Sequence, residues 1–116
     1  MTRLQRYLSV IVHTRFEGFH CWPMAPEPVE FLRHMHRHEF HVELIMRVTH
    51  AERDIEFIQV KNALEGFIHG NPFEDTASCE TMAGQIIDWA VEKYGERGII
   101  CCVFEDGENG AMVEES

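Results

Sequence analysis

The chain has 116 residues, of which 45% are hydrophobic, so it is long enough for one domain and too apolar for intrinsic disorder. Its 10 basic and 20 acidic residues give a formal net charge of −10, which argues against binding to a nucleic-acid backbone. No apolar run approaches the roughly 20 residues that span a bilayer, and the apolar stretch 7–12 is too short for the core of a signal peptide. We therefore expect residues 1–116 to form one cytoplasmic domain that binds neither nucleic acid nor membrane.

The four cysteines do not form the pattern of a disulfide framework. Cys101 and Cys102 are adjacent, so their side chains would point to opposite faces of a strand. We expect this pair, together with Cys21 and Cys79, to be reduced and partly buried.

Two strands are predicted in the first half of the chain. Residues 4–13 are rich in β-branched and aromatic residues, and residues 16–22 continue extended, with Gly18 as a candidate bulge. Three prolines between residues 23 and 28 then indicate a loop. The second strand is predicted over residues 36–48. One of its faces would carry four apolar side chains, those of Phe40, Val42, Leu44 and Met46.

Two helices are predicted next. The first covers residues 57–68, and the second begins after residue 76 or 78 and runs to about Tyr94. Thr76 or Ser78 can cap the second helix, and Gly95 would end it. The apolar stripe of the first helix would consist of Phe57, Val60, Lys61, Leu64 and Phe67 or Ile68.

The C-terminal segment is typical of a β-hairpin. Residues 99–104 form a nearly continuous apolar strand, residues 106–110 a turn, and residues 111–115 a returning strand. The order strand, strand, helix, helix, strand, strand predicts an α+β fold with a four-stranded antiparallel sheet and two helices on one face. Because exposed sheet edges must be covered or paired, we expect a homo-oligomer.

Histidines are concentrated between His20 and His41, where five of the eight lie. Side chains on a strand repeat every two residues, so His34, His36 and His38 would share a face, and two of them can direct imidazoles at one point. A third imidazole from the preceding strand would complete the three-ligand set typical of catalytic zinc. The alternative is a solvent-facing strand whose histidines are only polar or respond to pH, and the spacing alone favours it.

Five motifs occur in order along nearly the whole chain. Residues 16–20 read Phe-Glu-Gly-Phe-His, and residues 35–44 read Met-His-Arg-His-Glu-Phe-His-Val-Glu-Leu. The other three motifs are Ile-Glu-Phe-Ile-Gln-Val-Lys at 55–61, Ala-Ser-Cys-Glu-Thr-Met-Ala at 77–83 and Val-Phe-Glu at 103–105. Together they resemble the 6-pyruvoyl-tetrahydropterin synthase and 6-carboxy-tetrahydropterin synthase family of tunnelling-fold (T-fold) enzymes.

The resemblance implies zinc bound by His20, His36 and His38. It also implies a pterin or purine-like ligand held by Glu105, because a carboxylate can pair with a guanidine-like ring edge. Glu80 is a second candidate for ligand binding, although the dipole of the second helix alone favours an acidic residue there. The family forms trimers whose sheets close into a barrel, and two barrels stack into a homohexamer with sites between subunits.

The expected catalytic residues depart from the family pattern. The family's catalytic Cys precedes the first His of His-x-His by four residues, and Leu32 stands at that position. Glu30 is a candidate replacement base, and the alternative is a solvated loop residue. The family's Asp-His pair after the first helix is represented by Ile68 and His69, so His69 is a candidate catalytic residue without its orienting carboxylate.

Two functions follow as expectations. In the first, the chain is a zinc-dependent lyase that acts on 7,8-dihydroneopterin triphosphate or a related reduced pterin, in tetrahydropterin or 7-deazaguanine (queuosine) synthesis. In the second, it is a catalytically impaired relative that binds or sequesters a pterin- or purine-like ligand between subunits. The departures from the catalytic pattern favour the second function, and a histidine-rich metal buffer is a third alternative.

Overall fold

The computed structural model describes residues 3–116; residues 1 and 2 of the predicted domain lie outside this range. The elements are β1 (Leu8–His20), β2 (His36–Val48), α1 (Phe57–Gly70), α2 (Cys79–Tyr94), β3 (Ile99–Glu105) and β4 (Gly110–Glu115). The sheet has the order β1-β2-β3-β4 with antiparallel pairs throughout, so the predicted α+β fold and its order of elements are confirmed. Among the described residues, no helix has the length and apolar character needed to cross a membrane.

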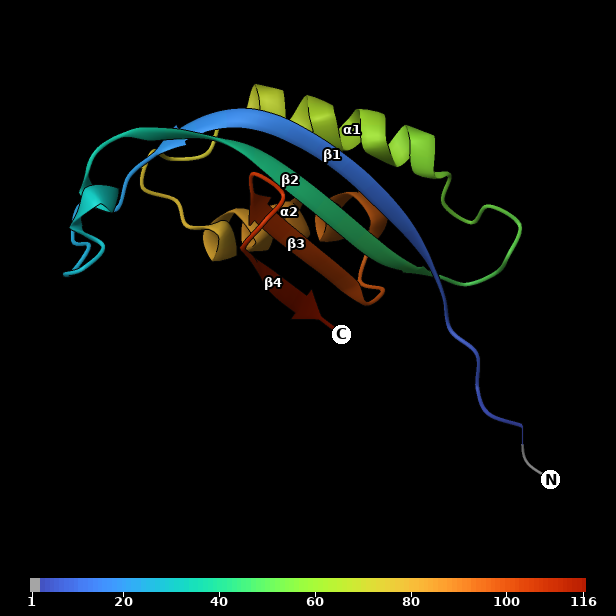
Figure 1. The fold of residues 1–116 in the computed structure, drawn as a ribbon. Helices are drawn as coiled ribbons and strands as arrows, with labels where there is room; N and C mark the ends of the chain where they lie inside the picture. Colours follow the sequence, from blue (N-terminus) through green and yellow to red (C-terminus); the bar gives the residue numbers. More distant parts are fainter. Residues whose placement is uncertain (1–2) are drawn as a thin grey trace.

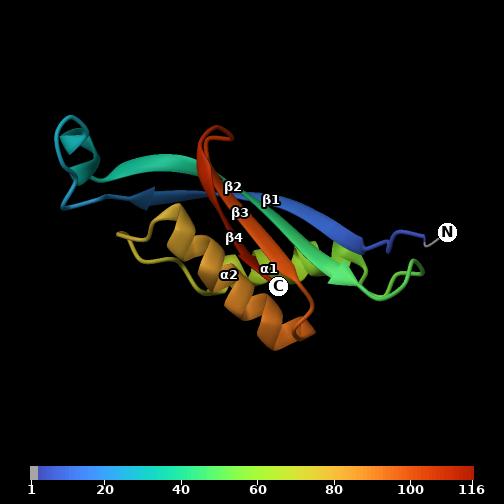
Figure 2. The ribbon, with the colours of Figure 1, turned by 90° about the horizontal axis from the view of Figure 1, so that it is seen from below.

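The first two strands form a long, curved ribbon that extends past the shorter β3 and β4 (Figure 1). Both helices lie on the same side of the sheet, as the view from below shows (Figure 2). The loop that joins β1 to β2 stands at one end of the ribbon and contains a short 3-10 helix, Glu30–Arg33, where only a loop was predicted. Strand β2 pairs with β1 on one side and with β3 on the other, so the ends of β1 and β3 both lie near the start of β2.

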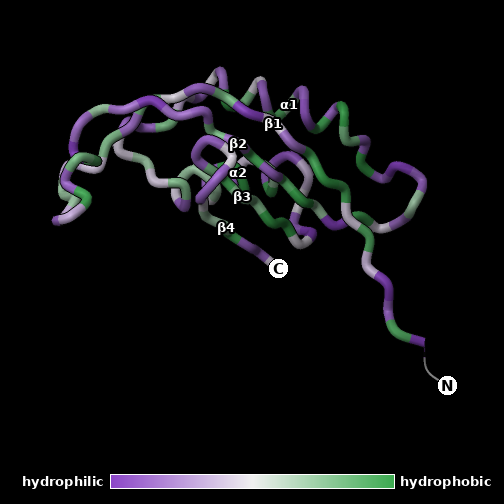
Figure 3. Tube along the Cα trace, in the orientation of Figure 1, coloured by the Kyte–Doolittle hydropathy of each residue, from purple (hydrophilic) through white to green (hydrophobic). Residues whose placement is uncertain are grey.

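The core lies between the sheet and the helices. Alternate residues of β2 are buried there, and Phe40, Val42, Leu44 and Met46 are each at most 2% exposed, which confirms the predicted face. They belong to one apolar cluster with residues of the two helices, among them Val60, Leu64, Ile68, Met82, Ile86 and Ala90. Figure 3 shows hydrophobic residues along β3, whereas the tip of the β3–β4 hairpin is hydrophilic.

The predicted apolar stripe of α1 was wrong at two positions. Its buried residues are spaced by four, and Phe57 and Lys61 are exposed. Phe57 is 55% exposed. A helix turns by about 100° per residue, so these two positions flank a stripe centred on Val60 and Leu64 instead of belonging to it.

Strand β1 also differs from its prediction. It begins at Leu8, which pairs with Val48 at the end of β2, so residues 3–7, predicted in part as strand, have no partner strand. The register continues without interruption to His20, so the predicted bulge at Gly18 was wrong. Gly18 instead provides space, because a Cβ atom there would lie 3.0 Å from the ring of Phe40.

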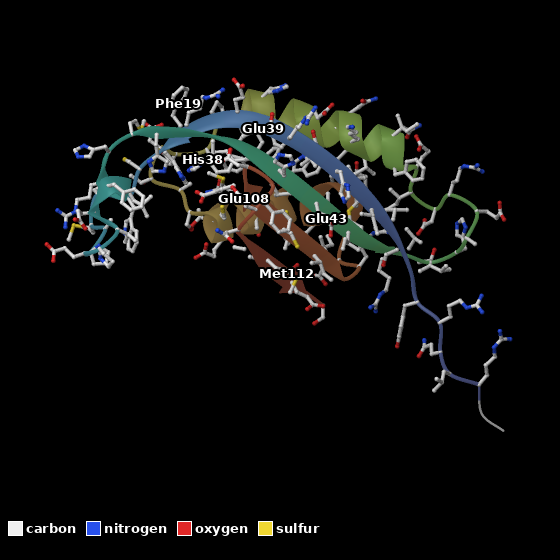
Figure 4. All side chains as sticks on the ribbon, in the orientation of Figure 1. Phe19, His38, Glu39, Glu43, Glu108 and Met112 are labelled. Carbon is white, nitrogen blue, oxygen red and sulfur yellow. The ribbon has the colours of Figure 1, made fainter. Side chains whose placement is uncertain are left out.

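The opposite face of the sheet is covered by neither helix. Cross-strand polar contacts lie on it, including the His13–Glu43 hydrogen bond at 2.8 Å and the Arg37–Glu17 ion pair at 2.7 Å. Glu43 and Met112, labelled in Figure 4, belong to this face, and Met112 is 62% exposed. The sheet of the single chain is open, so the oligomeric barrel stays a prediction.

All four cysteines are free, as predicted. Cys79 and Cys101 are buried, whereas Cys21 and Cys102 are partly exposed, so the adjacent pair divides between the two faces of β3. Burial raises the pKa of the Cys101 thiol to about 12. Burial and the nearby carboxylates of Glu105 and Glu80 raise the pKa of the Cys79 thiol to about 11.

These environments predict the order in which the thiols react. Cys21 is expected to react first with an aromatic disulfide reagent at pH 8, followed by Cys102, because only the thiolate attacks and access is required. Cys79 and Cys101 should stay unmodified until the protein is unfolded. Peptide mapping after timed labelling, with and without denaturant, measures this order, and early labelling of Cys101 would contradict it.

Candidate metal centre

The predicted ligands are brought together by strand pairing. His20 is the last residue of β1 and pairs with His36, the first residue of β2, while His38 follows on the same face of β2. Glu105 ends β3 and pairs with Phe40, which places its carboxylate beside the imidazoles. One ligand atom from each of the four residues lies within 4.8 Å of the other three. The three histidines and one glutamate therefore form a cluster that can hold a metal ion.

The spacing of the donor atoms fits one small cation. The Oε2 atom of Glu105 lies 2.9 Å from Nε2 of His20 and 3.5 Å from Nε2 of His38. Ligands of a tetrahedral zinc ion, with bonds of about 2.0–2.2 Å, stand about 3.4 Å apart. The two distances from Glu105, 2.9 and 3.5 Å, lie on either side of this donor–donor separation.

The other ring nitrogen of each histidine is fixed by an oxygen atom. Nδ1 of His20 donates to the carbonyl oxygen of Ala77 at 3.3 Å. Nδ1 of His36 donates at 2.8 Å to a carbonyl of the loop before β2, and Nδ1 of His38 donates at 2.7 Å to Oδ2 of Asp106. Because these oxygens accept hydrogen bonds, each neutral imidazole carries its proton on Nδ1 and a lone pair on Nε2.

The three Nε2 lone pairs need a positive partner. Nε2 of His36 is buried and has no hydrogen-bond partner among residues 3–116. Nε2 of His20 faces the carboxylate of Glu105 at 2.9 Å, where two acceptors repel each other unless a cation lies between them. A metal ion satisfies all four donors at once, whereas protons would have to charge several adjacent imidazoles. The residues present therefore fit a metal.

Asp106 orients the imidazole of His38 and was not predicted as a site residue. Its Oδ1 accepts the main-chain N–H of Glu39 at 2.9 Å, while its Oδ2 binds His38. The hydrogen bond from the Glu39 backbone, followed by that from His38, lowers the pKa of the Asp106 carboxyl. Asp106 has a positive φ of 56°, a conformation in which Asp is enriched. In the sequence, only the Asp106-Gly107 dipeptide, which is typical of a turn, indicated this conformation.

A pocket of about 520 Å³ adjoins the cluster, and His20, His36 and Glu105 form part of its wall. Leu32, where the resemblance places a catalytic Cys, also lines this pocket, as does the predicted ligand-binding residue Glu80. The pocket also contains the thiols of Cys21 and Cys79. Burial, followed by the carboxylates of Glu105 and Glu80, raises the pKa of the Cys79 thiol, which is opposite to the lowering that a catalytic thiolate needs.

Other predicted residues lie apart from the cluster. Glu30 is exposed in the 3-10 helix and does not line the adjoining pocket. His69 is exposed at the end of α1 and lines a different pocket of about 530 Å³, together with Phe16 and Phe73. His34 is exposed ahead of β2 and outside the cluster, so it does not share the face of His36 and His38 as the spacing predicted.

Comparison of the chain with protein-family models and with curated proteins gives no match. The resemblance to the tetrahydropterin synthases therefore depends on the five ordered motifs and stays a prediction.

Proposed function

We propose that this chain is a zinc protein whose metal is bound by His20, His36, His38 and Glu105. The observation that carries the proposal is the convergence of three Nε2 atoms, each left unprotonated by an oxygen that binds the opposite ring nitrogen. Three imidazoles and a carboxylate suit zinc best among the common divalent ions, although imidazole also binds copper, iron and nickel.

We further propose that the adjoining pocket takes a reduced pterin, with 7,8-dihydroneopterin triphosphate as the first candidate. Its volume and its mixture of apolar and polar walls support a ring-sized ligand, and Trp22 and Leu32 provide apolar surface. Zinc supplies Lewis acidity, which makes the hydroxyl groups of a bound side chain more acidic. The proposed activity is that of a lyase in tetrahydropterin or 7-deazaguanine synthesis.

A non-catalytic binding role is the second candidate, and specific positions favour it. Leu32 faces the pocket where the family has its thiol, and within one chain neither Glu30 nor His69 reaches the cluster. A protein with this wall can hold a ligand on the metal without a group placed to move protons.

A homohexamer remains part of the proposal. For the lyase, a neighbouring chain is the available source of a base.

The two candidates are separated by one assay. The native mass is measured first, and the proposed hexamer predicts six times 13.5 kDa. Zinc-loaded protein is then mixed with 7,8-dihydroneopterin triphosphate, and product and bound ligand are quantified. Turnover that His36→Ala abolishes supports the lyase, whereas stoichiometric binding without product supports the binding protein. If the zinc-loaded protein neither binds nor converts this compound, the pterin proposal fails.

A further inference from the structure

Glu105 differs from the three histidines in how it is held. Each imidazole is fixed through Nδ1 by a second partner outside the cluster. The carboxylate of Glu105, in the part of the chain described, makes its polar contacts only with His20 and His38. Its side chain is also the more accessible, at 34% exposed against 11% for His20 and 20% for His38. Glu105 is therefore the donor that can leave the cluster most easily.

The position of Glu105 also decides which way the metal is reached. Glu105 belongs to the wall of the adjoining pocket, so the coordination position that it fills faces that pocket. His20 and His36 line the same pocket, but their Nδ1 atoms are held by carbonyl oxygens, so Glu105 is the lining donor that lacks a second partner among the described residues. As long as Glu105 is bound, the site has four protein ligands, which is the closed coordination of a structural zinc site.

We infer that Glu105 is an exchangeable fourth ligand, which closes the metal site in the ligand-free protein and is displaced by an oxygen chelator from the pocket. The inference rests on the proposed metal function and adds to it how the site opens. It also changes the role of Glu105, because a carboxylate engaged on the metal cannot at the same time pair both oxygens with a ring edge. When an oxygen chelator takes the place of Glu105 on the metal, the freed carboxylate can pair with the ring edge of the same ligand.

Cobalt-substituted protein tests this inference, because the visible absorption of Co²⁺ changes with coordination number. The probe is acetohydroxamate, a small bidentate oxygen chelator, titrated into wild type, Glu105→Ala and Glu105→Gln. Opening the fourth position is expected to change the cobalt spectrum. An exchangeable Glu105 that closes the wild-type site for at least about nine-tenths of the time also predicts that its removal tightens chelator binding by at least about tenfold. Glu108→Gln is the matched control, since it removes an equal charge from the exposed turn that follows Glu105 without changing a pocket residue.

The outcomes separate the inference from the function on which it rests. Glu108→Gln should keep the wild-type spectrum and chelator affinity. Should Glu105→Ala bind Co²⁺ with an unchanged spectrum and an unchanged chelator affinity, Glu105 is not a ligand and the inference is overturned. A tenfold gain that Glu108→Gln reproduces would also overturn it, because the gain would then come from charge. A wild-type protein that takes up no Co²⁺ would instead contradict the metal site itself.

Discussion

Replacing His20, His36 and His38 together by alanine is expected to abolish stoichiometric metal binding. These residues supply three of the four donor atoms, and the variant retains only the partly exposed carboxylate of Glu105. Elemental analysis after zinc loading and desalting should find about one metal ion per native chain and none in the variant.

The same variant should lose the stabilisation that zinc provides. At a free zinc concentration of about 100 times Kd, binding stabilises a native protein by about 2.7 kcal/mol. For a domain of this size that corresponds to a rise of roughly 10 °C in Tm, whereas the variant should melt at one temperature with and without zinc. Circular dichroism measures this temperature and also establishes that the variant folds.

His34→Ala is the matched control. Its imidazole is exposed and outside the cluster, while its main-chain carbonyl, which binds His36, is kept by the substitution. This control should retain one zinc ion per chain and the full rise in Tm. Near-stoichiometric zinc in the triple variant would contradict the site, and loss of zinc in the control would place His34 among the ligands.

The fold was largely predictable because local patterns and tertiary packing agree. The four apolar side chains predicted for one face of β2 matched its burial, and Ser78 caps α2, whose helix ends before Gly95 as predicted. The errors occurred where packing decided the structure. No local signal distinguishes a bulge at Gly18 from a glycine that admits the ring of Phe40, since the ring comes from the neighbouring strand.

The candidate site was predictable only in part, for a geometric reason. A two-residue repeat places His36 and His38 on one face, but it does not say which residue of another strand lies opposite. The pairing of His20 with His36 is a property of the hairpin register, and the sequence indicated it only through the family resemblance. The resemblance in turn predicted Glu105 as a ring anchor, whereas the structure brings this carboxylate to the imidazoles.

Asp106→Asn is expected to lower zinc affinity by about 10- to 100-fold, the usual cost of losing the partner that orients a histidine ligand. Asn is suited to the positive φ of this position, so the backbone is not strained by the change. Its single carbonyl oxygen can accept the N–H of Glu39, and its amide nitrogen then faces Nδ1 of His38. That contact favours the His38 tautomer with its proton on Nε2, which cannot bind a metal. Zinc affinity is measured by competition with a chromophoric chelator.

Glu108→Gln controls for the loss of a negative charge from the same turn. Its backbone N–H binds the carbonyl of Glu105, and the substitution leaves this contact unchanged. Glu108, labelled in Figure 4 with His38, is exposed, so its variant should bind zinc within about twofold of wild type, as expected for a screened surface charge. Equal losses of affinity in the two variants would assign the effect to charge. Unchanged affinity in Asp106→Asn would show that His38 is oriented without Asp106 or is not a ligand, and zinc analysis of His38→Ala decides between these two.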